Sequence, residues 1–252
     1  MKLAAVQFRP PKGQPDLARR GLIGLIEHAG ASGADLIVCP EMATTGYIWP
    51  TPSALMPFAE PARGPTYQAL RGLAEKHRAW IVCGYAEQSG NALYNAALLI
   101  DPFGDLRRSY RKVLLYSADL TWARPGNRRM VLQTDLGNLA PAICMDLNDD
   151  GLIRYLYTAD VDVLAFCTNW VEQGSDVHPY WRWRLGGWPG WVVAANSWGE
   201  DEGTEFSGRS AILAPGGGVV SAAASVGDDV ILVDTDEVDL AKHQPPADGW
   251  IW

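Results

Sequence analysis

The sequence predicts an α/β protein built as a four-layer αββα sandwich, in which two mixed sheets lie between outer layers of helices. Apolar runs without alternation, typical of strands covered on both faces, recur along the chain and are separated by amphipathic helical stretches. Turn sequences rich in glycine and proline indicate additional antiparallel hairpins. About a dozen strands against four or five helices are too many for one doubly wound layer, so two stacked sheets are expected.

Helix and strand units alternate in the first third of the chain. The run Leu3–Phe8 predicts a strand, and apolar residues at helical spacing predict a helix over Asp16–Ala31. The unbroken Leu-Ile-Val-Cys core of Asp35–Glu41 predicts a strand covered on both faces. After a proline-rich loop, a helix over Thr66–Arg78 leads into a strand over Trp80–Tyr85. These units indicate a sheet flanked by helices.

The rest of the chain adds hairpins to this pattern. The turns Pro102-Phe103-Gly104 and Pro215-Gly216-Gly217-Gly218 are each expected to join two antiparallel strands, and no helix follows the glycines as a phosphate cradle would require. The further strands predicted are Leu93–Asp101, Leu106–Leu115, Val131–Thr134, Leu139–Cys144, Val161–Cys167, Trp191–Asn196, Gly208–Leu213, Val219–Ala224 and Val230–Val233, with one helix over Leu152–Ala159. We expect one domain over residues 1–252, of which 244–252 form a C-terminal tail.

Composition excludes several classes of function. The 252 residues carry 21 Lys+Arg against 29 Asp+Glu, a formal net charge of -8, and the basic residues form no stripe, so no nucleic acid partner is expected. Hydrophobic residues make up 48% and charged residues 20%, as in a folded globular protein. No apolar stretch approaches the ~20 residues that cross a bilayer, and the chain begins without a signal sequence, so neither a membrane partner nor export is expected.

Four cysteines, Cys39, Cys83, Cys144 and Cys167, lie in or beside apolar strand-like runs, with no pair at metal-binding spacing. They are expected to be reduced thiols of a cytoplasmic protein. The acidic run Asp146 to Asp150 has no histidine or cysteine at ligand spacing, so no metal site is expected. Asp149 is expected to cap the helix that follows it.

Three strand ends carry groups that together can hydrolyse an amide. Cys144 ends one buried run, Glu41 ends another, and Lys112 follows Tyr110-Arg111. A thiol is mostly neutral at pH 7, so its attack requires a nearby cation or base. Lys112 is expected to supply the cation, while Glu41 takes the thiol proton, passes it to the leaving amine and later activates water. Lys112 and the backbone N–H of Met145 are expected to stabilise the oxyanion.

Each of these residues has a structural interpretation as well. A lone cysteine at a strand end most often fills a core, a lone lysine is most often a solvated edge residue, and a lone glutamate is most often a cap or surface charge. A Cys-His dyad between Cys144 and His178 is the main alternative chemistry. The combination of all three strand-end groups favours the Cys-Glu-Lys interpretation.

Ordered motifs across nearly the whole chain resemble the nitrilase or carbon-nitrogen hydrolase superfamily. The residues that carry the resemblance are Leu36-Ile37-Val38-Cys39-Pro40-Glu41-Met42 with Thr45-Gly46-Tyr47, Tyr94-Asn95, Tyr110-Arg111-Lys112-Val113-Leu114-Leu115, Arg124-Pro125-Gly126, Ile143-Cys144-Met145-Asp146-Leu147, Thr168-Asn169-Trp170, Val192-Val193-Ala194-Ala195-Asn196 and Phe206-Ser207-Gly208-Arg209-Ser210. The resemblance implies an αββα sandwich, a covalent thioester mechanism and no metal or organic cofactor. It also implies a homodimer or larger homo-oligomer packed through the face near the catalytic segment.

The sequence departs from the family pattern in the pocket. Where many members carry a second pocket glutamate, this chain has the shorter Asp119, which is expected to orient the lysine or the substrate. The usual Phe-Pro-Glu after the nucleophile reads Asn148-Asp149-Asp150, and the family's usual helix text is replaced by the tryptophan-rich stretch from 181 to 189. These changes also leave room for a second hypothesis, a non-catalytic member that binds a partner.

Asp146, two residues after Cys144, is typical of the amide hydrolases in this family and favours a small linear amide as substrate, cleaved to a carboxylic acid and ammonia. A nitrile or an N-carbamoyl amine remains open as an alternative. Thr168 and Asn169 are expected to shape the pocket. Its aromatic wall is expected from Tyr47, Trp49, Trp170, Trp181, Trp183 and Trp188, each of which fits a core or dimer contact equally well.

Overall fold

The computed structural model describes residues 1–243. Two six-stranded sheets form its centre, with strand orders β14-β1-β2-β3-β4-β5 and β13-β12-β9-β8-β7-β6. The first sheet consists of β1 (Lys2–Gln7), β2 (Leu36–Val38), β3 (Trp80–Ser89), β4 (Ala92–Ile100), β5 (Leu106–Arg111) and β14 (Asp229–Asp234). The second consists of β6 (Leu132–Thr134), β7 (Gly137–Ile143), β8 (Val163–Thr168), β9 (Trp191–Asn196), β12 (Ala211–Leu213) and β13 (Val219–Ala222). The predicted pair of mixed sheets is therefore confirmed.

Each sheet has a parallel centre and antiparallel edges. The strands β1, β2 and β3 run parallel, as do β7, β8 and β9, while the hairpins β3–β4, β4–β5 and β12–β13 add antiparallel strands. The central strands are buried on both faces, which explains their unbroken apolar sequences. Parallel strands direct their carboxyl ends to one edge of a sheet, and this edge carries the predicted site residues.

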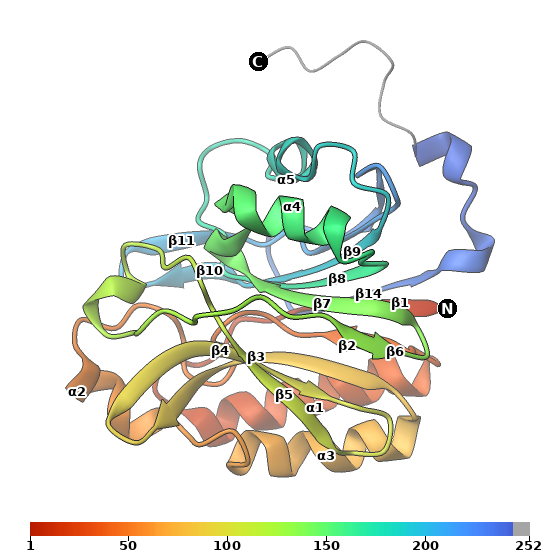
Figure 1. Ribbon diagram of the computed structural model, residues 1–252. Coiled ribbons are helices and arrows are strands. Elements are labelled where there is room, and N and C mark those ends of the chain that lie inside the picture. Colours follow the sequence, from red (N-terminus) through yellow and green to blue (C-terminus); the bar gives the residue numbers. More distant parts are fainter. Residues whose placement is uncertain (244–252) are drawn as a thin grey trace.

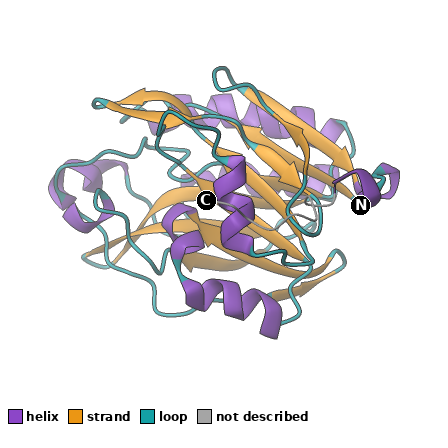
Figure 2. Ribbon diagram, turned by 90° about the horizontal axis from the view of Figure 1, so that it is seen from above, coloured by secondary structure: helices purple, strands orange, loops and turns teal. Residues whose placement is uncertain are grey.

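Helices cover the outer face of each sheet. The helices α1 (Pro15–Ala31) and α3 (Pro65–His77) pack on the first sheet, and α4 (Asp150–Thr158) and α5 (His178–Leu185) lie over the second (Figure 1). Seen from above, helices cross the strands of the second sheet on the near side (Figure 2). The remaining short elements are α2 (Pro52–Leu55) and the 3₁₀ turns Met56–Phe58, Asp119–Thr121, Cys144–Asn148, Thr235–Glu237 and Leu240–His243.

Two elements differ from the sequence prediction. The segment 172–188, for which the sequence predicted no helix, contains α5, which has Pro179 in its first turn and ends at Gly186 in the left-handed conformation. A two-stranded hairpin of β10 (Trp198–Asp201) and β11 (Thr204–Ser207) was not predicted, and it stands outside both main sheets. The predicted tail, residues 244–252, lies outside the described residues.

Several smaller predictions are confirmed. The glycines at 216 to 218 form the β12–β13 turn, with the Ala214 N–H donating to the Gly218 carbonyl over 2.8 Å. Asp149 caps α4 by accepting a hydrogen bond from the Gly151 N–H. All four cysteines are free thiols.

Candidate active site

Three strand ends from both sheets meet at one edge of the sandwich. Glu41 follows β2, Lys112 follows β5 and Cys144 follows β7, so the first two come from one sheet and the thiol from the other. Glu41 and Lys112 are 0% exposed, and Cys144 is 8% exposed. The interface between the sheets thus gathers the groups that the sequence places more than 30 residues apart.

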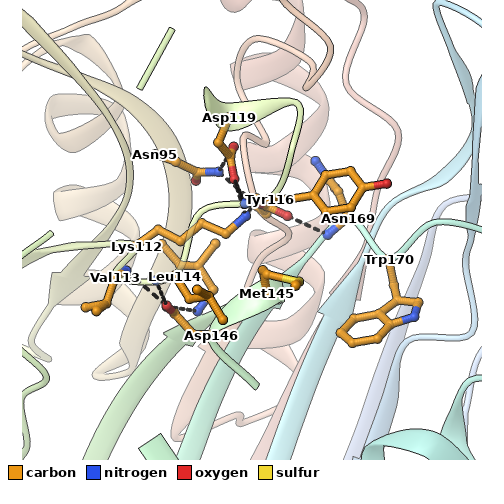
Figure 3. Close-up of polar contacts among 12 residues, drawn as sticks. Asn95, Lys112, Val113, Leu114, Tyr116, Asp119, Met145, Asp146, Asn169 and Trp170 are labelled. Atoms are coloured by element: carbon orange, nitrogen blue, oxygen red, sulfur yellow. Dashed lines mark hydrogen bonds and ion pairs between the residues drawn. The ribbon is translucent and has the colours of Figure 1, made fainter. Parts of the chain in front are cut away.

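Lys112 is held between two carboxylates. Its Nζ lies 2.7 Å from Glu41 Oε1 and 2.6 Å from Asp119 Oδ2. Asn95 Nδ2 donates to the same two groups, at 2.6 Å to Glu41 Oε1 and 2.9 Å to Asp119 Oδ1. Figure 3 shows the Lys112 side chain reaching toward Asp119, with Asn95 beside it. A buried ammonium balanced by two carboxylates leaves the cluster with one excess negative charge before the thiol is counted.

Both carboxylate oxygens of Asp119 accept hydrogen bonds from residues around Lys112. Besides Lys112 and Asn95, it accepts a hydrogen bond from the Tyr116 N–H over 2.9 Å. Its side chain is fully buried and is not among the residues that line the cavity beside Cys144. Asp119 therefore contacts the lysine and anchors the loop that carries Tyr116, and it does not face the substrate pocket.

Cys144 lies at a strained point of the backbone. Its φ is +43°, the left-handed region that side chains other than glycine rarely adopt, and it starts the 3₁₀ turn Cys144–Asn148 directly after β7. Such strain persists only where surrounding contacts impose it, and it often marks a functional position. The turn places the thiol at the end of the strand and brings the next residue, Met145, to the cavity wall.

The thiol is protonated in the resting site. Burial, together with the nearby charge of Glu41, raises the pKa of Cys144 to about 12, against the opposing effect of the Lys112 ammonium. The Thr168 hydroxyl faces the thiol and also acts to lower this pKa. Burial and the charge of Glu41 therefore outweigh the effect of the Lys112 ammonium on the thiol pKa. Attack requires a base that removes the proton as the bond forms.

Glu41 is placed to be that base. Burial raises its pKa above the ordinary glutamate value, although the charge of Lys112 acts in the opposite direction. Its second oxygen, Oε2, accepts a hydrogen bond from the Asn169 N–H over 2.8 Å. Burial would lower the pKa of Lys112, but Glu41 and the other negative groups raise it well above its ordinary value, so the lysine stays charged.

Asp146 links the lysine segment to the cysteine segment. Oδ1 accepts from the N–H groups of Val113 (2.9 Å) and Leu114 (2.8 Å), which follow Lys112. Oδ2 accepts from the Ile143 N–H (3.0 Å) and the Tyr110 hydroxyl (2.8 Å). Figure 3 shows Asp146 turned toward Val113 and Leu114. Since all its contacts are to these segments, it does not select an amide through contact with substrate.

A glycine permits the close approach of the Glu41 segment to β3. A Cβ on Gly84 would lie 2.3 Å from the Pro40 carbonyl oxygen and 2.5 Å from Glu41 Cα. The Gly84 N–H donates to Pro40, and its carbonyl accepts from Ala43. The backbone around the carboxylate is thus fixed by contacts that no larger residue allows.

The thiol opens into a small cavity of about 70 Å³. Its lining residues are Tyr116, Cys144, Met145, Asn148, Asn169, Trp170, Val171 and Gln173, none of which carries a charged side chain. The sequence predicted Met145, Asn169 and Trp170 for this pocket. It did not name Tyr116, Val171 or Gln173, which come from loops whose positions only the tertiary fold determines.

Tyr47 lies behind the lysine and lines a neighbouring cavity. Its ring centroid is 5.6 Å from Lys112 Nζ, and its buried hydroxyl has no hydrogen-bond partner among the described residues. The neighbouring cavity, about 290 Å³, is bordered by both Tyr47 and Asn169, so it adjoins the Cys144 cavity at Asn169. Tyr47 does not line the Cys144 cavity, and its pocket role stays a prediction.

The alternative dyad and most of the aromatic wall are not supported. His178 Nε2 lies 2.8 Å from the Arg209 carbonyl and Nδ1 lies 3.1 Å from Asp176, so both ring nitrogens are engaged away from Cys144. Trp181 and Trp188 are core residues. Of the predicted tryptophans, Trp170 alone lines the Cys144 cavity.

Residues 1–243 provide no group of three or more metal-ligating side chains placed to hold an ion. Asp149 pairs with Arg129 and Asp150 with Arg184, while Asp146 accepts hydrogen bonds from backbone N–H groups and from Tyr110. Within the same residues, no helix is long and apolar enough to cross a bilayer.

Comparison with known proteins identifies the family. The sequence model of the Carbon-nitrogen hydrolase family matches residues 2–243. The chain belongs to this family. The resemblance to the nitrilase superfamily is thereby confirmed, and the protein is a hydrolase of carbon–nitrogen bonds other than peptide bonds.

Relatives of this carbon-nitrogen hydrolase include nitrilases and amidases. It is 30% identical over 240 residues to "Nitrilase" of Pyrococcus abyssi, covering 94% of this chain and 90% of the relative. It is 28% identical over 260 residues to "Protein N-terminal amidase" of Schizosaccharomyces pombe, covering 84% and 91%. The solved amidase of Nesterenkonia sp. AN1 superposes with a TM-score of 0.81 at 21% identity, covering 96% of this chain and 98% of that one, which supports the same fold.

Proposed function

We propose that this carbon-nitrogen hydrolase cleaves small, uncharged linear amides to a carboxylic acid and ammonia through a thioester on Cys144. One observation carries the proposal. A strained, protonated thiol opens into a small uncharged cavity and lies beside a buried glutamate whose other contacts are to a lysine, an asparagine and a backbone N–H.

In the first half-reaction, Cys144 Sγ attacks the amide carbon while its proton moves to Glu41. The S–C bond forms, and the carbonyl oxygen becomes an oxyanion that Lys112 and the backbone N–H of Met145 stabilise. Loss of one such donor typically costs about 100-fold or more in rate. When the C–N bond breaks, Glu41 returns the proton to the nitrogen and ammonia leaves.

In the second half-reaction, water attacks the thioester. Glu41 takes a proton from the water, the S–C bond breaks and Cys144 regains a proton as the carboxylic acid leaves. One carboxylate therefore serves as base and acid in both halves, and burial, which raises the pKa of Glu41, makes the carboxylate easier to protonate than an ordinary glutamate.

The cavity supports a short acyl group without charge. The cavity has a volume of about 70 Å³ and no charged side chain on its wall, so a substrate carboxylate or ammonium would be buried there without a partner. Trp170 and Val171 offer apolar contact, while Asn148 and Gln173 offer hydrogen bonds. A relative named nitrilase keeps the nitrile alternative open to experiment.

A substrate panel tests the proposal. Purified protein is assayed for ammonia release from acetamide, propionamide, butyramide, succinamate, propionitrile and an N-carbamoyl amine. We expect turnover of the short neutral amides and at least tenfold lower kcat/KM for succinamate. Preferential turnover of the nitrile or the carbamoyl compound would replace the amidase assignment, and loss of all activity in Cys144→Ala is required.

Assembly and location are proposals as well. We propose a homodimer or larger homo-oligomer that packs through α4 and α5, where the large apolar side chains of Tyr157 and Trp183 are exposed. Light scattering of the purified protein tests this proposal, and a monomeric mass contradicts it. The four free thiols support a role in the cytoplasm, which fractionation of the source cells tests.

A further inference from the structure

The unpredicted β10–β11 hairpin carries a carboxylate that holds the loop of Tyr47. Asp201 Oδ2 accepts hydrogen bonds from the N–H groups of Tyr47 (2.8 Å) and Ile48 (3.0 Å). Its other oxygen, Oδ1, lies 2.7 Å from Lys12 Nζ, and Lys12 also donates to the Ile48 carbonyl. Asp201 therefore binds two N–H groups of this loop, and Lys12 binds one of its carbonyl groups.

The loop must be close to the carboxylate for these bonds to form, and Gly46 permits this. Gly46 has φ +79°, and a Cβ there would lie 3.2 Å from Asp201 Oδ2 and 3.2 Å from Lys12 Cγ. The loop thus lies so close to Asp201 and Lys12 that a larger residue at position 46 would crowd both.

Tyr47 transmits this hold to the active site. On one side, its ring packs edge-on against Phe206 of β11, with centroids 5.9 Å apart. On the other side, it lies 5.6 Å from Lys112 Nζ. Burial raises the pKa of the Tyr47 hydroxyl well above its ordinary value, and the charges of Lys112, Glu41 and Asp119 also act on this pKa.

The same hairpin also binds the segment 170–172, part of which lines the cavity beside Cys144. The Ser207 N–H donates to the Trp170 carbonyl over 2.9 Å, the Glu172 N–H donates to the Glu205 carbonyl over 2.8 Å, and Val171 forms a β-bridge with Phe206. Trp170 and Val171 line the cavity beside Cys144. One hairpin therefore contacts both Tyr47, which lies beside Lys112, and the residues that line the Cys144 cavity.

We propose that the β10–β11 hairpin sets the geometry of the active site and that Asp201 is a positioning residue, acting on Lys112 through Tyr47. This inference rests on the proposed function only in its rate measurements, since the position of the lysine also affects the reactivity of the Cys144 thiol. Asp201 itself contacts neither the cavity beside Cys144 nor the catalytic side chains.

The hairpin offers a matched control. Glu202 follows Asp201 and also lies near Lys12, at 3.4 Å, but its side chain is 65% exposed, against 12% for Asp201. No bond joins Glu202 to the Tyr47 loop in the described structure. Glu202→Gln removes a charge from the same hairpin and leaves the bonds between Asp201 and the Tyr47 loop intact.

The first experiment compares Asp201→Ala with Glu202→Gln in amide hydrolysis. We expect kcat to fall by about tenfold or more in Asp201→Ala, because small displacements of reacting groups have effects of this size, and to stay within twofold in Glu202→Gln. If Asp201→Ala does not fold, Asp201→Asn, which retains one acceptor oxygen, takes its place with a smaller expected loss. A kcat within twofold of wild type in the folded variant overturns the proposal.

A double-mutant cycle separates positioning from general structural support. If Asp201 acts through Tyr47, the double variant Asp201→Ala/Tyr47→Leu loses no more kcat than Tyr47→Leu alone, while independent effects would multiply. Multiplying losses overturn the route through Tyr47. Thermal unfolding is measured for all variants, and a lower melting temperature with unchanged kcat also counts against the proposal.

Alkylation of Cys144 by iodoacetamide, followed by intact mass and peptide mapping, gives a readout without amide turnover. We expect slower alkylation in Asp201→Ala, since a displaced Lys112 no longer favours the thiolate, and a wild-type rate in Glu202→Gln. If wild-type protein hydrolyses no amide but alkylation still slows, the proposed function fails and the positioning role stands. If amides are hydrolysed and neither rate changes, the positioning role alone fails.

Discussion

Two polar clusters lie on opposite faces of the same edge of the first sheet, and they differ in burial and in hydrogen bonding. Arg111 and Lys112 are consecutive at the end of β5, and strand alternation sends them to opposite faces. Arg111 forms two hydrogen bonds to Glu87, at 2.6 and 3.1 Å, and lies over the Tyr94 ring. Ser109 donates to the same carboxylate over 2.8 Å. This outer cluster pairs one cation with one anion.

The inner cluster is arranged differently. Lys112 is shared by two carboxylates and has no exposed surface, whereas the Arg111 side chain is 34% exposed. The inner cluster also retains a buried amide oxygen on Asn95 and a buried hydroxyl on Tyr47 without partners among the described residues. An outer pair of this kind stabilises a strand edge, while the excess charge and unused hydrogen-bonding groups of the inner one suit a reacting ligand.

The largest difference between the inner and outer clusters is expected when the cation of each is removed in turn. Lys112→Gln leaves Glu41 and Asp119 buried without a counter-charge, so we expect a loss of about 3–5 kcal/mol in the free energy of unfolding and no measurable turnover. Arg111→Gln should cost about 1–2 kcal/mol, because Ser109 still donates to Glu87, and should retain activity. Urea denaturation and ammonia release measure both, and equal losses in the two variants would remove the distinction.

A second test concerns the link between the lysine and cysteine segments. Asp146→Asn replaces one of two acceptor oxygens by a donor that faces N–H and O–H groups, so we expect a cost of about 2–3 kcal/mol and a marked fall in kcat. Asp149→Asn is the control, since this residue caps α4, and an asparagine caps almost as well. A wild-type kcat in Asp146→Asn would contradict this role of Asp146.

A third test displaces the glutamate without changing its charge. Gly84→Ala places a methyl group against Pro40 and Glu41, so we expect about 1–2 kcal/mol of destabilisation and a loss of about tenfold in kcat. Gly72→Ala in α3 meets nothing within 4 Å and should preserve both activity and fold. Activity assays at matched folded concentration compare them, and an unaffected Gly84→Ala would show that the close approach is dispensable.

The smallest expected effect is in the pH dependence. Burial raises the pKa of Glu41, so kcat/KM should fall, as pH is lowered, at a higher pH than for an ordinary glutamate. Between the unfolded and the raised folded pKa, the native state binds more protons, so the contribution of Glu41 to stability is lost as pH rises through this window. Activity and this stability term therefore change in opposite directions.

The pH profile also reports on the thiol. Because the pKa of Cys144 is about 12, kcat/KM should stay level from neutral pH to pH ~9, with no rise from thiolate formation. Steady-state rates and urea denaturation across pH measure both effects. A rise that follows an ordinary thiol pKa would contradict the account of a protonated resting nucleophile.

Sequence reasoning predicted the sandwich because buried parallel strands have unbroken apolar runs, as in Leu36–Val38 and Val163–Thr168. The same pattern placed Glu41 and Cys144 at strand ends. Lys112 follows β5, a mostly polar antiparallel edge strand that ends at Arg111, whereas the sequence predicted it to continue to Leu115. The β10–β11 hairpin was missed because its residues are mostly polar, although Asp201-Glu202-Gly203 is a turn signal. Such short strands depend on tertiary contacts more than on local pattern.

The roles of individual polar side chains were harder to predict. Asn95 was noted only as part of a motif, yet it bonds to both carboxylates of the inner cluster. Asp146 was interpreted as a marker of substrate class, but its four contacts are to backbone and to Tyr110. Apart from Ile143, these partners lie 24 to 54 residues away in sequence, so spacing alone does not reveal them.

The central claim is that the Cys144 thiol, activated by Glu41, carries the acyl group during turnover. Intact-protein mass spectrometry of wild-type protein quenched during hydrolysis of propionamide tests it most directly, with peptide mapping to locate the adduct. We predict a propionyl thioester on Cys144 that hydroxylamine removes, and neither adduct nor ammonia release in Cys144→Ala. Ammonia release by Cys144→Ala at the wild-type rate, or an acyl group on another residue, would contradict the account.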